Sequence, residues 1–244
     1  MITSGDLVHY WKCDEGSGNS VVDTVAAYNG TWTPARWAAG PAGLTTSIDG
    51  TEAVNERTTT TGAPASVDFA GEFTVSFWTN IRAQNTSGTN RNAWVFKHTD
   101  GTFDGTIAKY PWMVATDNAE ATIDVFDGVA WRSVALSGNI VGVDKHICVV
   151  FTGGNVRVYE NGVDRGTDTF TNSDASGNIY FGDWITTSAH NGIDGVTAEI
   201  ALINAPITPA EVLELYNGGV PPDVVAVFTA PVKPAWQWGQ RWRW

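Results

Sequence analysis

Aromatic and polar side chains gather in one loop-like segment of this sequence. Residues 182–192 read Gly-Asp-Trp-Ile-Thr-Thr-Ser-Ala-His-Asn-Gly. Sugar rings stack on aromatic faces while their hydroxyls bond to carboxylate, amide and imidazole groups, and ligand pockets have this mixed lining. The alternative is that Trp184 packs beneath its own loop while its polar neighbours cap turns. We expect a glycan-binding surface here, joined by two tryptophans from the middle of the chain, with the candidate residues Trp112, Trp131, Asp183, Trp184, His190 and Asn191.

Four tryptophans near the carboxyl end all occupy even positions: Trp236, Trp238, Trp242 and Trp244. In an extended strand they share one face, with the arginines on the other. Each tryptophan buries on the order of 150–250 Å² when packed, and four left in water are an aggregation liability. Two alternatives stay open, namely packing against the same domain and lying at a membrane interface. We expect the segment to dock on a neighbouring protein subunit through Trp236, Trp238, Arg241, Trp242, Arg243 and Trp244.

The chain lacks the residue patterns that catalysis requires. Glycosidases use paired carboxylates that face one cleft, and the pattern Glu-x-Asp-x-x-Glu is absent. Asp124 and Asp127 have opposite strand parity and face apart unless Asp127 lies in a turn, which is the interpretation we favour. No nucleophile elbow, phosphate loop or His-Glu-x-x-His motif is present. The four histidines show no metal-binding spacing, and we expect His146 to be a packed or edge residue. We therefore expect no enzymatic activity.

The charge of the chain is acidic and unevenly distributed. It has 14 Lys+Arg against 26 Asp+Glu, a formal net charge of −12, so it lacks the basic footprint of a nucleic-acid-binding protein. No acidic residue follows Asp223, whereas Lys233, Arg241 and Arg243 do. Residues 1–223 therefore carry 11 − 26 = −15 and residues 224–244 carry +3. Residues 224–244 are therefore basic, whereas the rest of the chain is acidic.

Two features bear on the cellular compartment. Residues 1–6 lack the basic and apolar regions of a secretory signal, so we expect synthesis in the cytosol without a signal peptide, followed by release in a virion or another extracellular assembly. Cys13 and Cys148 lie far apart in the sequence. We expect two reduced, partly buried thiols, with a disulfide between them as the alternative.

The hydrophobic pattern is strand-like nearly throughout. Residues 73–82 alternate cleanly, with Phe73, Val75, Phe77 and Ile81 on one face. A hairpin is predicted over 147–159, with a turn through Thr152-Gly153-Gly154-Asn155. One helix is predicted near the end, because Thr208, Pro209 and Glu211 form a capping box before an apolar stripe. Further strands are expected near 7–12, 93–98, 112–116, 121–126, 129–136, 178–181 and 196–203.

The order of these motifs resembles the laminin-G-like, concanavalin-A-like lectin jelly-roll family. Residues 7–18 are similar to its opening strand, which ends in an acidic pair and Gly-Ser-Gly, and residues 73–78 (Phe-Thr-Val-Ser-Phe-Trp) are similar to its central strand. Residues 145–162 resemble its hairpin, and residues 195–212 its closing strand and short helix. The resemblance spans roughly 7–217 and is poor over 83–135. It implies an all-β fold, an antiparallel two-sheet jelly-roll sandwich with one short C-terminal helix and an extended C-terminal tail.

We expect a laminin-G-like jelly-roll domain over residues 1–220, where the resemblance lies, and, from the tryptophan and charge pattern, a Trp/Arg-rich anchoring tail over 221–244. The resemblance also implies binding of glycans or proteins without catalysis or a required cofactor. Many relatives hold a structural calcium ion, but Ala198-Glu199 stands where an Asp-Glu pair is common, so calcium stays open and no metal ligand is assigned. We expect a structural or adhesion protein held on a larger assembly, with a bacteriophage virion (capsid decoration or tail component) as the favoured setting. The alternatives are a free carbohydrate-binding module and a glycoside hydrolase.

Overall fold

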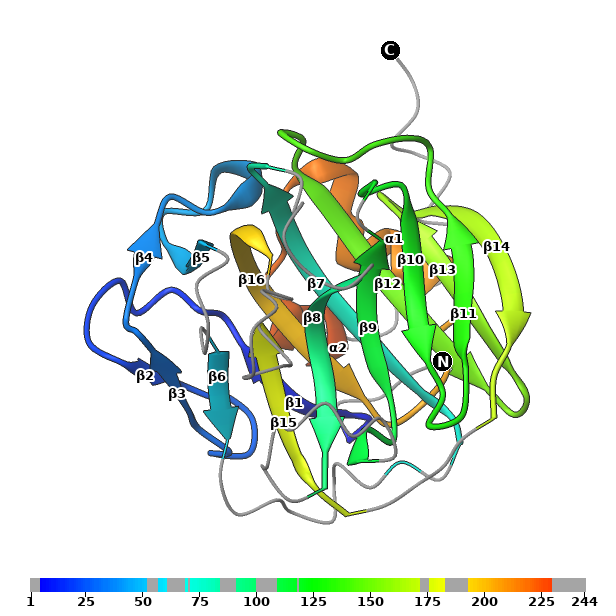
Figure 1. Cartoon of the computed structure of the whole chain (residues 1–244). Helices are drawn as coiled ribbons and strands as arrows, with labels where there is room; N and C mark the ends of the chain where they lie inside the picture. Colours follow the sequence, from blue (N-terminus) through cyan, green and yellow to red (C-terminus); the bar gives the residue numbers. More distant parts are fainter. Residues whose placement is uncertain are drawn as a thin grey trace.

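The computed structural model describes residues 5–51, 57–60, 69, 71–83, 91–99, 109–117, 119–171, 176–182 and 193–229. These residues form two sheets of eight strands packed face to face (Figure 1). Every pair of named strands among them is antiparallel. The expected two-sheet sandwich is therefore confirmed. Segment 183–192 and the tail from residue 230 onward lie outside the described residues.

Sheet A contains the clearest strands of the sequence. Its order is β14-β13-β12-β7-β16-β5-β4, and β1 also pairs with β16. The predicted hairpin is present as β12 and β13, in which Thr152 pairs with Asn155. The bounds are β1 Leu7–Trp11, β4 Trp37–Ala38, β5 Ser47–Thr51, β7 Phe73–Ile81, β12 Lys145–Thr152, β13 Asn155–Glu160, β14 Val163–Thr169 and β16 Asp194–Ile203.

Sheet B carries the region that resembles the family least. Its order is β11-β10-β9-β8-β15-β6-β3-β2. In Figure 1 its strands β8, β9, β10 and β11 lie in front of sheet A. The bounds are β2 Ser20–Val21, β3 Gly30–Thr33, β6 Arg57–Thr60, β8 Arg91–His98, β9 Met113–Asp117, β10 Thr122–Phe126, β11 Trp131–Ala135 and β15 Asn178–Gly182.

The core between the sheets is dominated by aromatic rings. The Phe73 ring stacks on Phe151 at 4.0 Å and on Phe69 at 4.6 Å between centroids. Trp11 meets the edge of Phe181 across the sandwich at 4.9 Å. The predicted inward face of β7 is confirmed, because its four alternating apolar side chains all belong to this core. Both cysteines are buried and free, as expected.

A buried histidine–aspartate contact joins β1 to the loop that follows it. Nδ1 of His9 lies 2.7 Å from Oδ2 of Asp23, and both side chains are fully buried. The Asp23 carboxylate also accepts hydrogen bonds from the backbone N–H groups of Tyr10, Val25 and Tyr28. Burial would raise the pKa of Asp23, but the bonds from His9 and the backbone outweigh it and lower that pKa. This carboxylate fixes the path of the chain around β1.

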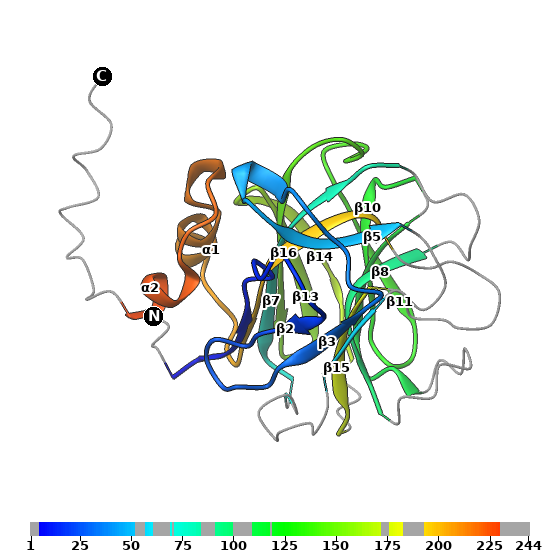
Figure 2. The same ribbon diagram turned by 90° about the vertical axis from the view of Figure 1, so that its left-hand side faces the viewer.

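Two helices cover the outer face of sheet A, as Figure 2 shows from the side. Helix α1 (Pro209–Tyr216) has the predicted capping box, in which the Thr208 side chain accepts from the Glu211 N–H. Helix α2 (Val224–Thr229) was not expected, and the extended conformation expected from residue 221 is wrong for residues 224–229. Short 3-10 turns occupy Pro41–Gly43 and Asn217–Gly219. No helix in the described part of the chain is long and apolar enough to span a membrane.

Candidate functional site

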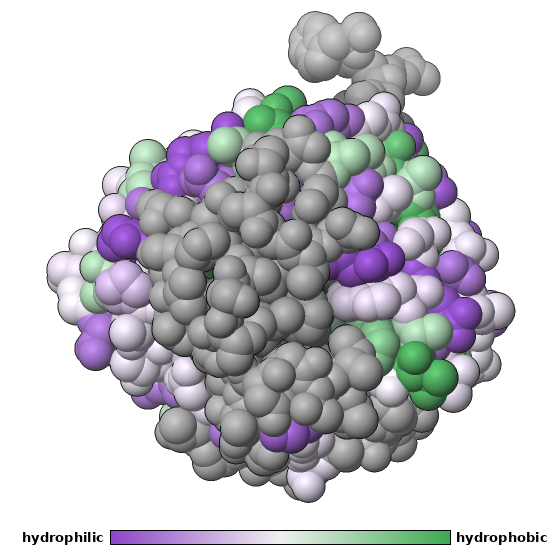
Figure 3. All heavy atoms as spheres, in the orientation of Figure 1, coloured by the Kyte–Doolittle hydropathy of each residue, from purple (hydrophilic) through white to green (hydrophobic). Residues whose placement is uncertain are grey.

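The outer face of sheet B carries a second apolar cluster, separate from the core between the sheets. Trp131 of β11 is half-buried and packs at the edge of this cluster. In Figure 3 the described surface over β10 and β11 is mostly hydrophilic to neutral, with a small hydrophobic patch. The cluster thus gives a firm base to a partly exposed aromatic ring. Its buried members are Ala93, Phe96, Tyr110, Met113, Ala115, Phe126 and Tyr180.

An arginine from another strand lies on this tryptophan. The Arg91 guanidinium carbon is 4.4 Å from the centre of the Trp131 ring, the geometry of a cation–π contact. Nε of Arg91 is 2.7 Å from Oδ2 of Asp124, and the arginine is 27% exposed whereas the aspartate is only 2% exposed. Thr122 donates its hydroxyl hydrogen to Asp124 at 2.9 Å. The buried carboxylate therefore holds a surface guanidinium in place.

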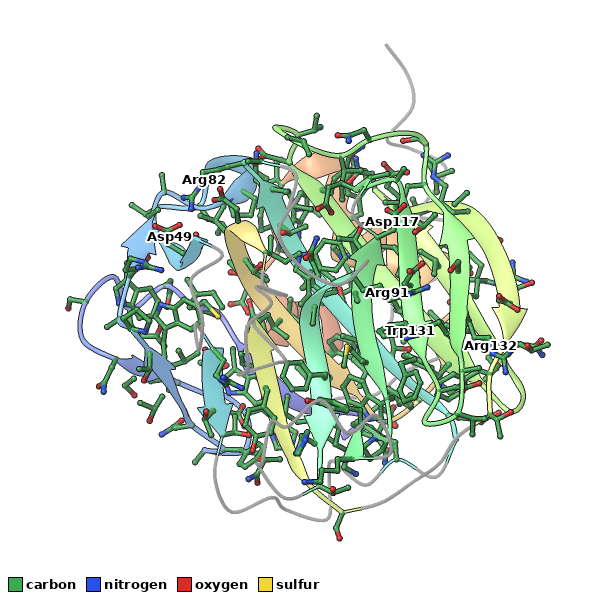
Figure 4. The ribbon with its side chains drawn as sticks, in the orientation of Figure 1. Asp49, Arg82, Arg91, Asp117, Trp131 and Arg132 are labelled. Carbon is green, nitrogen blue, oxygen red and sulfur yellow. The ribbon has the colours of Figure 1, made fainter. Side chains whose placement is uncertain are left out.

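Register explains why these groups meet. Trp131 pairs directly with Phe126, and their rings are 5.3 Å apart at 53°. Asp124 lies two residues before Phe126 on β10 and so projects to the same face. Figure 4 shows Arg91, Asp117 and Trp131 over strands β8 to β11. We call this group the Trp131 surface, and its residues are Arg91, Asp117, Thr122, Asp124 and Trp131.

Each of the two turns that flank β10 is held by an aspartate, the first by Asp117 of the Trp131 surface and the second by Asp127. Asp117 accepts from the N–H groups of Ala121 and Thr122. Asp127 accepts from the N–H groups of Val129 and Ala130, and it is outside β10. Burial would raise the pKa of Asp127, but these backbone bonds and Arg132 outweigh it and lower that pKa. The expectation that Asp127 lies in a turn is confirmed.

The structure separates the two mid-chain tryptophans that were expected to join the glycan surface. Trp112 is 2% exposed in the core, where its ring is 5.2 Å from Phe73 and 6.4 Å from Phe151. Its ring faces are not available to a ligand, whereas Trp131 is on the outside. Asp183, Trp184, His190 and Asn191 lie outside the described residues. The sequence patterns did not predict that Arg91 and Asp124 lie beside Trp131. The spacing of two residues between Asp124 and Phe126 on one strand did indicate that these two side chains share a face.

A second polar group closes the rim of the sandwich near the ends of segment 183–192. Arg82 binds the carboxylates of Asp49 and Asp194 and the carbonyl oxygen of Gly50. Figure 4 shows Asp49 and Arg82 together at the edge of the sandwich, away from Trp131. A small cavity lies behind them between the sheets, with Trp32, Trp94 and Phe181 in its wall. Because the Arg82 guanidinium is already bonded to the oxygens of Asp49, Gly50 and Asp194, we assign these residues a structural role.

His146 is a packed residue, and the part of the chain that the structure describes shows no metal centre. His146 is buried, with Nε2 2.8 Å from the Ser76 hydroxyl, and burial lowers the pKa of His146 to about 3. The expected packed histidine is confirmed. No group of three or more His, Cys, Asp or Glu side chains that could hold a metal ion is found among these residues.

Two antiparallel sheets with a polar, aromatic outer face define a lectin-type sandwich. The sequence profile of the Laminin_G_3 family, described as the concanavalin A-like lectin/glucanases superfamily, matches residues 49–213. The chain belongs to this superfamily. No curated protein matches it in a direct sequence comparison.

Solved structures with a similar fold include binding domains of toxins and a sialidase. The binding domain of Paraclostridial Mosquitocidal Protein 1 has a TM-score of 0.67 at 14% identity, covering 88% of this chain and 52% of that one. Trypanosoma rangeli sialidase in complex with 2,3-difluorosialic acid has 0.63 at 14%, covering 88% and 33%. The botulinum neurotoxin type G receptor binding domain has 0.61 at 13%, covering 87% and 51%. This chain thus spans about half of each of the two binding domains and a third of the sialidase, and the likeness is one of fold.

Proposed function

We propose that this chain is a non-catalytic glycan-binding domain of an adhesion or structural protein. The Trp131 surface is the observation that carries the proposal, since it combines an aromatic ring with a fixed arginine on the outer face of a lectin-type sheet. Two of the structural neighbours are named as binding domains, which supports a recognition role. The separation of Asp124 from Asp127 supports a role without catalysis, because no carboxylate pair forms there.

The geometry suits contact with a sugar ring. The half-buried Trp131 provides apolar area beside Arg91 for the C–H face of a sugar, and Arg91 provides N–H donors for hydroxyl oxygens. Oγ1 of Thr122 can accept from a sugar hydroxyl, because its own hydrogen goes to Asp124. Asp124 orients Arg91 from below, so little side-chain entropy is lost on binding. The contact is shallow, and we expect a weak affinity for a single sugar that repeated copies would strengthen.

Trp131→Ala should weaken glycan binding about tenfold or more, because it removes the central aromatic contact. Binding is first located on a glycan array and then measured by titration calorimetry on a ligand from that array. Val129→Ala is the matched control, because Val129 is 72% exposed in the adjoining turn and makes no part of the surface. Thermal unfolding of both variants separates binding from stability. Equal affinities for Trp131→Ala and the wild type would remove the Trp131 surface from the proposal.

We further propose that residues 231–244 anchor the domain to a protein assembly, with a phage virion as the favoured setting. The support comes from the sequence: four tryptophans on alternate positions, a charge of +3 against −15 for the body, and the need to cover that apolar face.

Deleting residues 231–244 should leave a folded domain that no longer assembles. Sedimentation velocity of the full and shortened chains measures this, with the full chain giving the larger species. Replacement of all four tail tryptophans by serine should act like the deletion, whereas serine at Gln237 and Gln240 should not. Equal masses for all variants would contradict the anchoring role, and glycan binding by a full chain that stays monomeric would favour a free carbohydrate-binding module.

A further inference from the structure

Glu199 occupies an unusual position in the last strand of sheet A. The register of β16 shifts between Ala198 and Ala201, and Glu199 at this bulge has a φ of 54°. Its backbone N–H donates to the carbonyl oxygen of Lys12 at 3.1 Å. Bulges redirect side chains, and here the whole Glu199 residue is only 6% exposed. The Tyr10 hydroxyl donates a hydrogen bond to its Oε2.

The same tyrosine connects this carboxyl to helix α2. Tyr10 is fully buried in the apolar cluster beneath the helices, together with Val224 and Phe228. Val224 is the first residue of α2, and helix α2 is in contact with strand β1. Tyr10 therefore links the Glu199 carboxyl on β16 to the packing of α2. Figure 2 shows α2 on this side of sheet A.

The charges that face Glu199 are mostly of its own sign. Lys12, directly after β1, attracts the carboxylate, whereas Asp14, and Asp223 before α2, repel it. Cys13, between Lys12 and Asp14, keeps a neutral thiol because burial raises its pKa. Among the described residues, no lysine or arginine forms an ion pair with Glu199. Burial first, and then these aspartates, raise the pKa of Glu199 to about 7, against the lowering effects of Tyr10 and Lys12.

We propose that Glu199 is a proton-controlled latch for helix α2. With a proton on Glu199, the carboxyl is neutral, accepts from Tyr10 and lets α2 pack on sheet A. Loss of the proton places a buried carboxylate beside Asp14 and Asp223 and loosens the helix. Residue 230 follows α2 directly, so the latch sets how firmly the carboxyl-terminal segment is held at its root. This inference concerns α2 itself and does not depend on glycan binding or on the anchoring role.

The direction of the pH effect follows from linkage. A carboxyl with a raised pKa in the docked state binds its proton more tightly there than when it is solvated with its ordinary value of 4.5. Docking is therefore strongest below pH 4.5. It weakens by up to about tenfold per pH unit between 4.5 and 7, and it changes no further well above pH 7.

Hydrogen exchange measured by mass spectrometry tests the latch on the full chain. Peptides covering residues 224–229 are followed from pH 5 to pH 8, and rates are expressed as protection factors to remove the intrinsic pH dependence. The wild type should lose protection over this range, by up to about 70-fold if release of α2 returns Glu199 to its ordinary pKa. Glu199→Gln should lose none, because glutamine is a neutral acceptor for Tyr10 at every pH. A flat wild-type profile, or the same loss in Glu199→Gln, would overturn the proposal.

Two further variants keep the test decisive if Glu199→Gln folds poorly. Asp223→Asn removes a repelling charge and should move the midpoint of the loss to lower pH. Tyr10→Phe removes the donor that favours the carboxylate and should move it to higher pH. Glu214→Gln removes a carboxyl from α1 instead and serves as the control, with an unchanged midpoint. An unchanged midpoint in both Asp223→Asn and Tyr10→Phe would also overturn the proposal.

Discussion

Phe73→Ala should destabilise the sandwich by about 3–5 kcal/mol, the usual cost of removing a buried phenylalanine ring. The Phe73 side chain is 0% exposed and stacks between Phe69 and Phe151, with Trp112 on a third side. These three neighbours are aromatic residues that are themselves packed in the core. They cannot readily move to fill the space that the Phe73 ring would leave. The substitution therefore combines lost burial of apolar area with a cavity.

Urea denaturation at constant pH measures this loss as a change in the free energy of unfolding. Val143→Ala is the control, because Val143 is 46% exposed and surface substitutions usually stay within about 0.5 kcal/mol. A loss below about 1 kcal/mol for Phe73→Ala would show that the aromatic stack is not a main support of the core.

Asp23→Ala should cost a similar amount, about 3–5 kcal/mol, for an electrostatic reason. The variant leaves His9 without its carboxylate at a fully buried site. It also removes the acceptor for the N–H groups of Tyr10, Val25 and Tyr28. Buried donors without partners each carry a desolvation penalty. Thermal and urea unfolding at pH 7 measure the loss, and Asp144→Ala, at a largely exposed position, is the matched control.

The stabilising effect of Asp23 should also depend on pH in a defined direction. Its pKa is lowered in the folded protein, so its contribution is complete above the unfolded value near 4. It is lost as pH falls through the folded pKa. The difference in unfolding free energy between the wild type and Asp23→Asn should therefore shrink in acid, whereas Glu199 acts between pH 4.5 and 7 in the opposite sense. A constant difference from pH 7 to pH 2 would contradict this assignment.

The parts of the fold that the sequence predicts are those with a complete local signal. Strand β7 alternates over nine residues, the hairpin has its turn residues, and α1 has a full capping box. Strands β2 and β4 are only two residues long and show no period, and β14 is largely polar because much of it is exposed. Helix α2 has a cap, since the Asp223 carboxylate accepts from the Ala226 N–H. Its Val-rich sequence has a low helix propensity, however, and it packs on apolar residues distant in sequence. Tertiary packing decides these elements.

The candidate site was predictable only in part. Trp112 and Trp131 look alike in sequence, and only their positions relative to the two sheets place one inside and the other outside. Arg91 reaches Trp131 from a strand 40 positions earlier, through a sheet order that single-sequence periodicity does not give. Register between β10 and β11 then brings Phe126 under the ring. The sequence indicated that Trp131 could contact a ligand, but it did not indicate which side chains lie beside this ring.

Strand β1 and helix α2, one near each end of the described chain, pack against each other on sheet A, whereas Trp131 belongs to the opposite sheet. The two ends of the described chain therefore lie on one side of the sandwich, and Trp131 lies on the other. A carrier fused at either end would leave Trp131 pointing outward. Copies arranged side by side on a common support would present their aromatic faces in the same direction, which is the orientation that multivalent recognition of a coated surface needs.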